Sequence, residues 1–283
     1  MIKVLHPGMY SSVQDTGRMG YAKMGVSISG SIDAYSAEIA NALLNNKRSE
    51  AVIEITFGMA KFEFITATFI CITGADFSPK LNGESLKMMT VYEVSKDSVL
   101  TFGKRKYGVR TYVAVQGGIQ TETILNSRSF FKGITNRGQL QKGEELPILA
   151  KQPFGNRAFS KIKIFEEIFG WNELKCHPGP EFDRLNLEQK KRLAQPFLIS
   201  EDNNRVGYRL KEFIVNDLKP ILTSGVLPGT VQLTPSGELI VLMRDAQVTG
   251  GYPRVLQLSK LAINILAQKM TGEKLCFKID CGI

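Results

Sequence analysis

An internal repeat constrains this chain more than any other feature of its sequence. The only two histidines both precede Pro-Gly, at His6 and His177. An Asp-x-x-Arg-x-Gly-Tyr pattern that begins at Asp15 recurs with identical spacing from Asp202. Four further matches follow in the same order: 29–30 with 224–225, 53–56 with 231–234, 73–74 with 249–250, and 97–102 with 273–277. Because the matches keep their order, they predict two copies of one structural unit.

The chain length agrees with a duplication. Its 283 residues suit two domains, or one large one, at roughly 100–200 residues per domain. Insertions in surface loops account for the unequal spacing between the matches. We therefore predict a first unit over 1–170, which carries an extra arm from about residue 110 onward, and a second unit over 171–283.

Most of the predicted elements are strands. Short β-branched or aromatic runs between turn residues are typical of strands, and they lie at 51–55, 61–64, 68–73, 99–102, 111–115, 239–243 and 275–279. Two segments have apolar residues at helical spacing: 32–44, after the predicted N-cap Ser31, and 256–270, before Gly272. This pattern predicts a mainly β fold, built as a pair of small closed or half-closed barrels.

Composition and motifs exclude several classes of protein. The formal charge is +9, but the basic clusters at 104–106 and 190–192 are short and far apart, so we expect a basic solvated surface and no nucleic-acid partner. No apolar run approaches the ~20 residues that span a bilayer. The four cysteines form no C-x-x-C pair and no secretory leader is visible, which favours the reducing cytoplasm.

Several familiar sites are absent from the sequence. There is no phosphate-binding loop, no dinucleotide fingerprint and no nucleophile elbow. We predict no metal site, because neither histidine lies near a second ligand at the required spacing. No lysine lies in the Ala-Met-Lys-Met context to which biotin is attached, so this chain carries no covalent biotin.

The segment 11–18 combines hydroxyls, a carboxylate, a guanidinium and glycine. In a structural interpretation, Asp15 caps backbone amides and pairs with Arg18. In a functional interpretation, Arg18 presents its planar guanidinium to a carboxylate or a carboxylated intermediate. The sequence leaves both open.

Two acids are candidates for proton transfer. Glu54 lies within an apolar strand, yet its repeat match is the neutral Gln232. Such a carboxylate either faces solvent or faces a cleft, where burial raises its pKa and suits it to acid–base work. Asp33 is either a first-turn acid that the helix dipole favours or a second catalytic carboxylate.

Glycine pairs that follow strands are candidates for ligand binding. Adjacent glycines let the backbone approach a ligand and offer amides to an oxyanion, or they simply form a tight turn or bulge. The site that we predict has Glu54, Asp33 and Arg18 as catalytic residues, and its substrate-binding residues are Gln116, Gly117, Gly118, Arg128, Gln247, Gly250, Gly251 and Tyr252.

The same motifs resemble those of a known family. They lie at 6–18, 29–33, 40–41, 54–58, 110–119, 127–129, 228–232 and 249–253. In order and content they are similar to the biotin-dependent carboxyltransferase A/B-subdomain family. Its members include the second allophanate-hydrolase-type subunit, the carboxyltransferase part of urea carboxylase, the C subunit of bacterial 5-oxoprolinase, and a Kip-type antagonist of a sporulation-kinase inhibitor.

The resemblance implies a fold, a reaction and partners. The fold is a cyclophilin-like β-barrel in each half. The reaction is the ATP-dependent opening of 5-oxo-L-proline to L-glutamate, performed with a B subunit that bears the C/D subdomains and with an A subunit. ATP is the implied cofactor, bound by this chain or elsewhere in the complex. Two alternatives are a carboxyltransferase half that acts on urea or a related amide with biotin in trans, and a regulatory protein that binds a kinase inhibitor.

Overall fold

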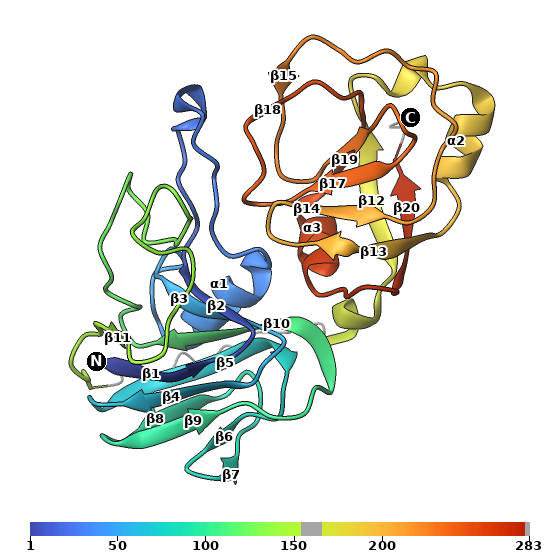
Figure 1. Ribbon diagram of the computed structural model, residues 1–283. Helices are drawn as coiled ribbons and strands as arrows, with labels where there is room; N and C mark the ends of the chain where they lie inside the picture. The colour runs from blue at the N-terminus through green and yellow to red at the C-terminus, as the bar shows by residue number, and fades with distance from the viewer. Residues whose placement is uncertain (154–165, 281–283) are drawn as a thin grey trace. The chain divides into compact units, whose positions relative to one another are not determined.

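The computed structural model describes residues 1–153 and 166–280. It divides into two compact units (Figure 1): a first unit of Met1–Arg18 and Ser29–Glu167, and a second unit of Met19–Ile28 and Ile168–Ile283. The division at 167/168 falls close to the predicted boundary at 170/171. The sequence did not predict that residues 19–28 group with the second unit. Part of the predicted arm, at 154–165, lies outside the described residues.

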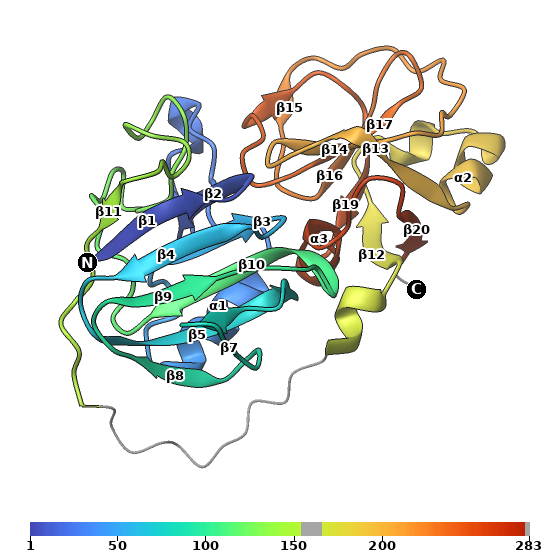
Figure 2. The same cartoon turned by 60° about the horizontal axis from the view of Figure 1, so that its bottom comes forward.

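Two antiparallel sheets form the first unit (Figure 2). The six-stranded sheet has the order β11 (Glu145–Leu146), β1 (Ile2–Pro7), β4 (Ala60–Phe64), β9 (Ser98–Thr101), β6 (Lys80–Leu81), β7 (Glu84–Ser85). The five-stranded sheet has the order β2 (Tyr10–Gln14), β3 (Val52–Thr56), β10 (Tyr107–Val115), β5 (Thr68–Asp76), β8 (Val91–Val94). One buried apolar cluster contains side chains from both sheets, which therefore pack face to face.

The five-stranded sheet carries helix α1 (Ala34–Leu43) on its other face. Side chains alternate along a strand: on β10, Val113 and Val115 enter the core between the sheets, whereas Tyr112 and Ala114 pack with α1. Strand β3 alternates in the same way, so Glu54 shares the α1 face with its neighbour Val52. A carboxylate is thereby placed beneath a helix rather than in solvent.

Helix α1 begins later than the sequence predicted. Its N-cap is Asp33, whose side chain accepts a hydrogen bond from the amide of Ser36. The predicted N-cap Ser31 lies in the preceding turn and is therefore wrong. Asp33 is the cap because a carboxylate at this position satisfies a free amide of the first turn.

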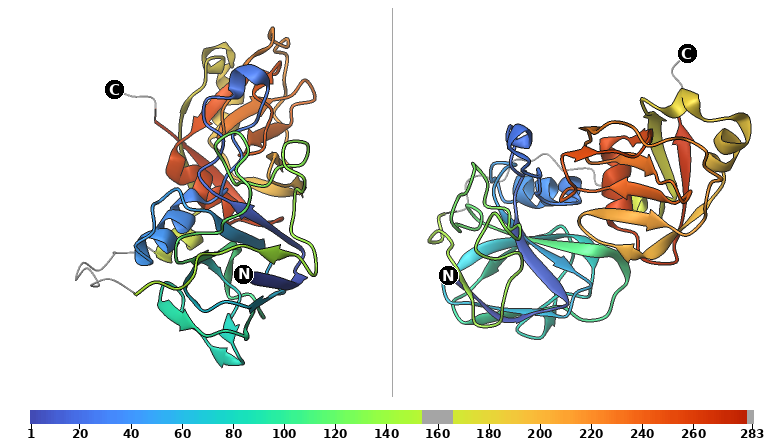
Figure 3. Two further views of the ribbon diagram at one scale, coloured as in Figure 1. Left: turned by 90° about the vertical axis from the view of Figure 1, so that its left-hand side faces the viewer. Right: turned by 45° about the horizontal axis from the view of Figure 1, so that its top comes forward.

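A closed barrel forms the second unit (Figure 3). Its strand order is β12 (Glu173–Pro178), β19 (Arg254–Leu258), β16 (Thr230–Leu233), β17 (Leu239–Leu242), β14 (Gly207–Leu210), β13 (Phe197–Asn203), β20 (Lys274–Ile279). A parallel pairing of β20 with β12 closes it. The other elements are β15 (Ser224–Gly225), β18 (Thr249–Gly250), α2 (Leu187–Leu193), α3 (Lys260–Ala267) and the 3-10 helices η1 (Ala22–Met24), η2 (Glu166–Gly170) and η3 (Phe182–Arg184).

The predicted helix 256–270 is in fact a strand followed by a helix. Leu256 and Leu258 belong to β19, and α3 begins after Ser259, whose hydroxyl caps the amide of Ala262. The periodicity was misread because the alternating leucines of the strand run directly into the apolar face of the helix. The seven predicted strands are all confirmed, as β3, β4, β5, β9, β10, β17 and β20.

The strands that the repeat matched do not have equivalent neighbours. Strand β3 pairs with β2 and β10, whereas its match β16 pairs with β17 and β19. Strand β9 pairs with β4 and β6, whereas its match β20 pairs with β12 and β13. The expectation that the matched strands occupy equivalent places in two copies of one unit is therefore wrong, because short turn motifs recur without fixing which strands pair. The duplication itself stays a prediction.

Three properties of the described residues bear on function. No helix among them is long and apolar enough to cross a membrane. No group of three or more His, Cys, Asp or Glu side chains among them is arranged to hold a metal ion. Cys71, Cys176 and Cys276 are free thiols, and burial raises the pKa of Cys71 to about 12.

Candidate functional site

The carboxylate of Asp15 joins two of the signature segments of the first unit. It accepts hydrogen bonds from the hydroxyls of Ser127 and Ser129, both at 2.6 Å. It also accepts from the amides of Gly17, at 2.8 Å, and Arg128, at 2.7 Å. We call these five residues the Asp15 cluster. The expectation that Asp15 caps backbone amides is confirmed.

The turn at 29–31 packs against the Asp15 cluster. The amide of Ser31 donates to the backbone carbonyl of Asp15 at 2.9 Å. Ser29 and Gly30 both have positive φ, 57° and 90°. A Cβ atom on Gly30 would lie 2.9 Å from the backbone nitrogen of Gly17, which is closer than packing allows. Only glycine fits here, because the conformation and the close approach both exclude a side chain.

Glu54, Tyr112 and Asp33 form a buried network beneath the start of α1. Oε2 of Glu54 accepts from the Tyr112 hydroxyl, at 2.8 Å, and from the amide of Ile32, at 2.9 Å. The Tyr112 hydroxyl in turn accepts from the amide of Asp33 at 2.9 Å. Glu54, Asp33 and Tyr112 are all fully buried, so the interpretation that Glu54 faces solvent is wrong.

The electrostatics of this network keep Tyr112 protonated. Burial is the largest cause that raises its pKa well above the ordinary value, followed by the nearby carboxylates of Glu54 and Asp33. Asp33 also accepts from the Ser36 hydroxyl, at 2.5 Å. Two carboxylates and one neutral phenol thus share a site from which water is excluded, an arrangement that can hold or pass a proton.

The two arginines of the predicted site already make contacts within the first unit. Arg18 is buried and its guanidinium donates to the carbonyl oxygen of Ser129. Arg128 donates to the carbonyl of Thr121 and, at 3.0 Å, to Oε1 of Gln120. Both guanidiniums therefore hold loops of the first unit in place. That either arginine binds a substrate carboxylate stays a prediction.

The amides of the first glycine pair are also engaged. The amide of Gly117 donates to Oδ1 of Asn46 at 2.8 Å, and that of Gly118 donates to the carbonyl of Val115 at 2.9 Å. Both glycines have positive φ, 76° and 75°. These amides are not offered to an oxyanion in this conformation, because protein acceptors already satisfy them. The tight-turn interpretation accounts for their geometry.

Gln116 and Gly117 nevertheless line a cavity of about 370 Å³. Its other walls come from residues 44–50 and 149–153, and Gln116 exchanges two hydrogen bonds with the backbone of Gln152, at 2.9 and 3.2 Å. The cavity lies at the C-terminal end of α1, whereas Asp33 and Glu54 lie at its N-terminal end. A ten-residue helix separates the two by about 15 Å.

The remaining predicted residues belong to the second unit. Gly250 lies in β18 and packs so closely on Gln232 that a Cβ would meet its Nε2 at 2.4 Å. Gly251 accepts a hydrogen bond from the amide of Ile221, and Tyr252 is 39% exposed. Gln247 lies just before β18. A cleft that joins these side chains to Arg18, Glu54 and Asp33 stays a prediction.

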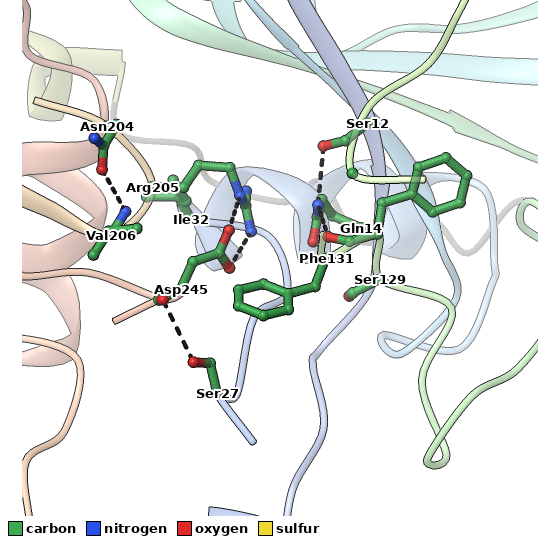
Figure 4. A network of polar contacts seen from close by, with 12 residues as sticks. Ser12, Gln14, Ser27, Ile32, Ser129, Phe131, Asn204, Arg205, Val206 and Asp245 are labelled. Carbon is green, nitrogen blue, oxygen red and sulfur yellow. Dashed lines mark hydrogen bonds and ion pairs between the residues drawn. The ribbon is translucent and has the colours of Figure 1, made fainter. Parts of the chain in front are cut away.

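Ion pairs in the second unit organise its loops. Arg205 forms a bidentate pair with Asp245, at 2.7 and 3.0 Å, and the Ser27 hydroxyl donates to the Asp245 carbonyl (Figure 4). Figure 4 also shows the first-unit bond from Gln14 to the Ser12 hydroxyl. Asp202 is exposed, and unlike Asp15 its carboxylate accepts no amide of a residue that the structure describes. The matched motifs thus have different roles in the two units.

Sequence reasoning missed Tyr112 as part of the site. It lies directly opposite Glu54 in the register of β10 and β3. The signal that would have found it is a tyrosine in one apolar strand and a glutamate in another. A hydroxyl and a carboxylate that are both buried must each find a hydrogen-bond partner, and each can serve as the other's.

Known proteins are similar to this chain over most of its length. A family model described as "Carboxyltransferase domain, subdomain A and B" matches residues 24–279. The chain belongs to this carboxyltransferase A/B-subdomain family. It is 33% identical over 293 aligned positions to the 5-oxoprolinase C subunit of Escherichia coli, covering 100% of this chain and 92% of that protein. It is 38% identical over 226 positions to urea amidolyase of Lachancea kluyveri, covering 74% of this chain but 12% of that protein.

Solved structures of the family have the same fold. The crystal structure of TTHA0988 matches with a TM-score of 0.85 at 27% identity, over 98% of this chain and 55% of that one. The chain thus spans about half the length of that structural relative. The crystal structure of the K. lactis urea amidolyase matches with a TM-score of 0.85 at 24% identity, over 98% of this chain and 18% of that one.

Proposed function

We propose that this chain is the C subunit of an ATP-dependent 5-oxoprolinase that opens 5-oxo-L-proline to L-glutamate in the cytoplasm. The observation that supports this most strongly is similarity along nearly the whole of both chains: the 5-oxoprolinase C subunit of Escherichia coli aligns over 92% of its own length. The corresponding protein of Haemophilus influenzae aligns over 91% of its length at 28% identity. The partners are the B and A subunits of the same enzyme, and ATP binds to the complex.

Ring opening adds one water across the lactam C–N bond. The carbonyl carbon gains an oxygen and becomes a carboxylate, and the ring nitrogen leaves as an amine after it gains a proton. We assign proton transfer to Glu54 and Asp33. Their burial and their shared partner Tyr112 support this role, because proton transfer needs a group that is held in place and shielded from water. Arg18 orients the substrate carboxylate.

The experiment that tests this function is reconstitution. The chain is co-purified with candidate partners for the A and B positions of the complex, and release of L-glutamate from 5-oxo-L-proline is measured with and without ATP. Release that needs ATP and all three proteins supports the proposal. A complex that assembles but releases no L-glutamate under these conditions contradicts it.

A second candidate is a carboxyltransferase half that acts on urea or a related amide, with biotin supplied by another protein. The 38% identity to a urea amidolyase favours it. The same preparation, supplied with a carboxylated biotin carrier and urea, distinguishes the two. Loss of the carboxyl group from the carrier only in the presence of urea supports this second candidate.

A further inference from the structure

The cavity at the C-terminal end of α1 has the properties of a separate ligand site. Its volume of about 370 Å³ lies near the lower end of the range for small-molecule pockets, roughly 300–1,000 Å³. It is lined by polar and charged side chains as well as by Leu44 and Leu149. The Glu54–Tyr112–Asp33 network lies at the other end of the helix, so this cavity is not part of it.

Glu50 gives the cavity an unpaired negative charge. Its backbone is fixed, since its amide donates to the carbonyl of Lys47 at 3.0 Å and its carbonyl accepts from Nδ2 of Asn41 at 2.8 Å. The half-buried carboxylate packs against Gly118. Within residues 1–153 and 166–280 it has neither an ion pair nor a hydrogen bond. A carboxylate held in this way at a cavity wall is suited to receive a cation.

The helix end and Lys47 complete a dipolar site. The C-terminal end of α1 carries partial negative charge, which adds to the preference for a cation near Glu50. Lys47 lines the same cavity, is exposed, and has no ion pair with any described residue. The walls therefore offer one negative and one positive group to a single occupant.

We propose that this cavity binds a free α-amino acid. Glu50 receives the α-ammonium group, and Lys47 receives a carboxylate. A lactam has no ammonium group and lacks the first of these contacts. The site consequently favours a free amino acid over a lactam.

Only the choice of L-glutamate as the first probe rests on the proposed function. If the chain belongs to a 5-oxoprolinase, L-glutamate is the product, and the cavity distinguishes it from the substrate by charge. The site itself depends only on Glu50, Lys47 and the cavity. A failure of one proposal therefore leaves the other intact.

Calorimetric titration of the full chain tests the site. The probes are L-glutamate, N-acetyl-L-glutamate, which lacks the ammonium group, and 5-oxo-L-proline. We expect saturable 1:1 binding of L-glutamate and weaker binding of the other two. Because hydrogen bonds to charged groups contribute more than neutral ones, Glu50→Gln should weaken L-glutamate binding by about 10- to 100-fold. Lys47→Gln should also weaken it.

Matched controls are available on the surface. Glu122 and Lys142 are exposed and do not line the cavity, so Glu122→Gln and Lys142→Gln should bind as the unchanged chain does. Absence of saturable binding, or Glu50→Gln binding as tightly as the unchanged chain, overturns the proposal. If the reconstituted complex opens 5-oxo-L-proline while the cavity binds no amino acid, the function stands and this inference fails.

Discussion

At the scale of single residues, polar groups in the first unit form buried hydrogen-bond networks. The Tyr112 hydroxyl bridges a carboxylate and a backbone amide, and all three groups are buried. Asp15 accepts four hydrogen bonds, one from Gly17 and three from the segment 127–129. Such fully satisfied networks hold side chains rigidly, which a proton-transfer site needs.

Tyr112→Phe should destabilise the first unit while it leaves the overall fold intact. It removes the hydroxyl that donates to Glu54 and accepts from the amide of Asp33. Buried groups left without a partner cost about 1–3 kcal/mol, so the free energy of unfolding in urea should fall by about that amount. Tyr92→Phe is the control, since its hydroxyl accepts a bond in an exposed loop. Equal effects of the two variants would contradict the account of the network.

Gly30→Ala should destabilise the first unit more than Gly133→Ala does, although the two glycines have a similar φ. At Gly133, φ is 94° and no atom lies within 4 Å of the position that a Cβ would take, whereas at Gly30 backbone atoms lie at 2.9–3.0 Å. Gly133→Ala should therefore cost only the left-handed strain of about 1–2 kcal/mol. Gly30→Ala should exceed that cost in the same urea unfolding measurement. A smaller effect at Gly30 would contradict this account, because it would show that the turn at 29–31 shifts readily to make room for a Cβ atom.

At the scale of elements, the strands of the first unit were predictable and the helix ends were not. β-branched and aromatic runs set the strands, because each of them fills a half-buried pleated surface. The alternation that places Glu54 under α1 depends on which face the helix covers, a tertiary choice that no local pattern encodes. That the N-cap of α1 is Asp33 rather than Ser31 depends on which side chain reaches a free amide.

The ion pair between Glu181 and Arg254 fixes η3 to β19 in the second unit. Arg254 donates to both carboxylate oxygens, at 2.9 and 3.0 Å, and its backbone amide donates as well. These hydrogen bonds from Arg254 hold the pKa of Glu181 below its usual 4.5 and raise that of Arg254. Both side chains are largely buried, so the pair should matter more than a surface ion pair.

The stability contributed by this pair should disappear in acid. Because the pKa of Glu181 is lowered by folding, its contribution is present above the usual value of 4.5 and is lost as the pH falls through the lowered pKa. Glu181→Gln should reduce the free energy of unfolding at pH 7 by about 1–3 kcal/mol and weaken its dependence on pH below 4.5. The exposed Asp183→Asn should change neither. An unaltered acid profile for Glu181→Gln would contradict the assignment.

At the scale of the whole molecule, the sequence predicted the family and the mainly β fold, but not how the strands pair. Recurring motifs, beginning at His6 and His177, predicted equivalent strands in two copies of one unit, which the strand pairing does not reproduce. Strand pairing depends on contacts between distant segments, and a local motif carries little information about them. By contrast, the signature segments of the first unit do converge, at the Asp15 cluster and at Glu54; they are 6–18, 29–33, 54–58, 110–119 and 127–129.

The most direct test of the central claim is ATP-dependent release of L-glutamate from 5-oxo-L-proline by this chain assembled with the two proposed partner proteins. We predict that release requires this chain. Because proton transfer by a positioned side chain contributes on the order of 100- to 10,000-fold, Glu54→Gln should assemble normally yet lose about that much activity. Release at an equal rate without this chain, or full activity of both Glu54→Gln and Asp33→Asn, would contradict the account.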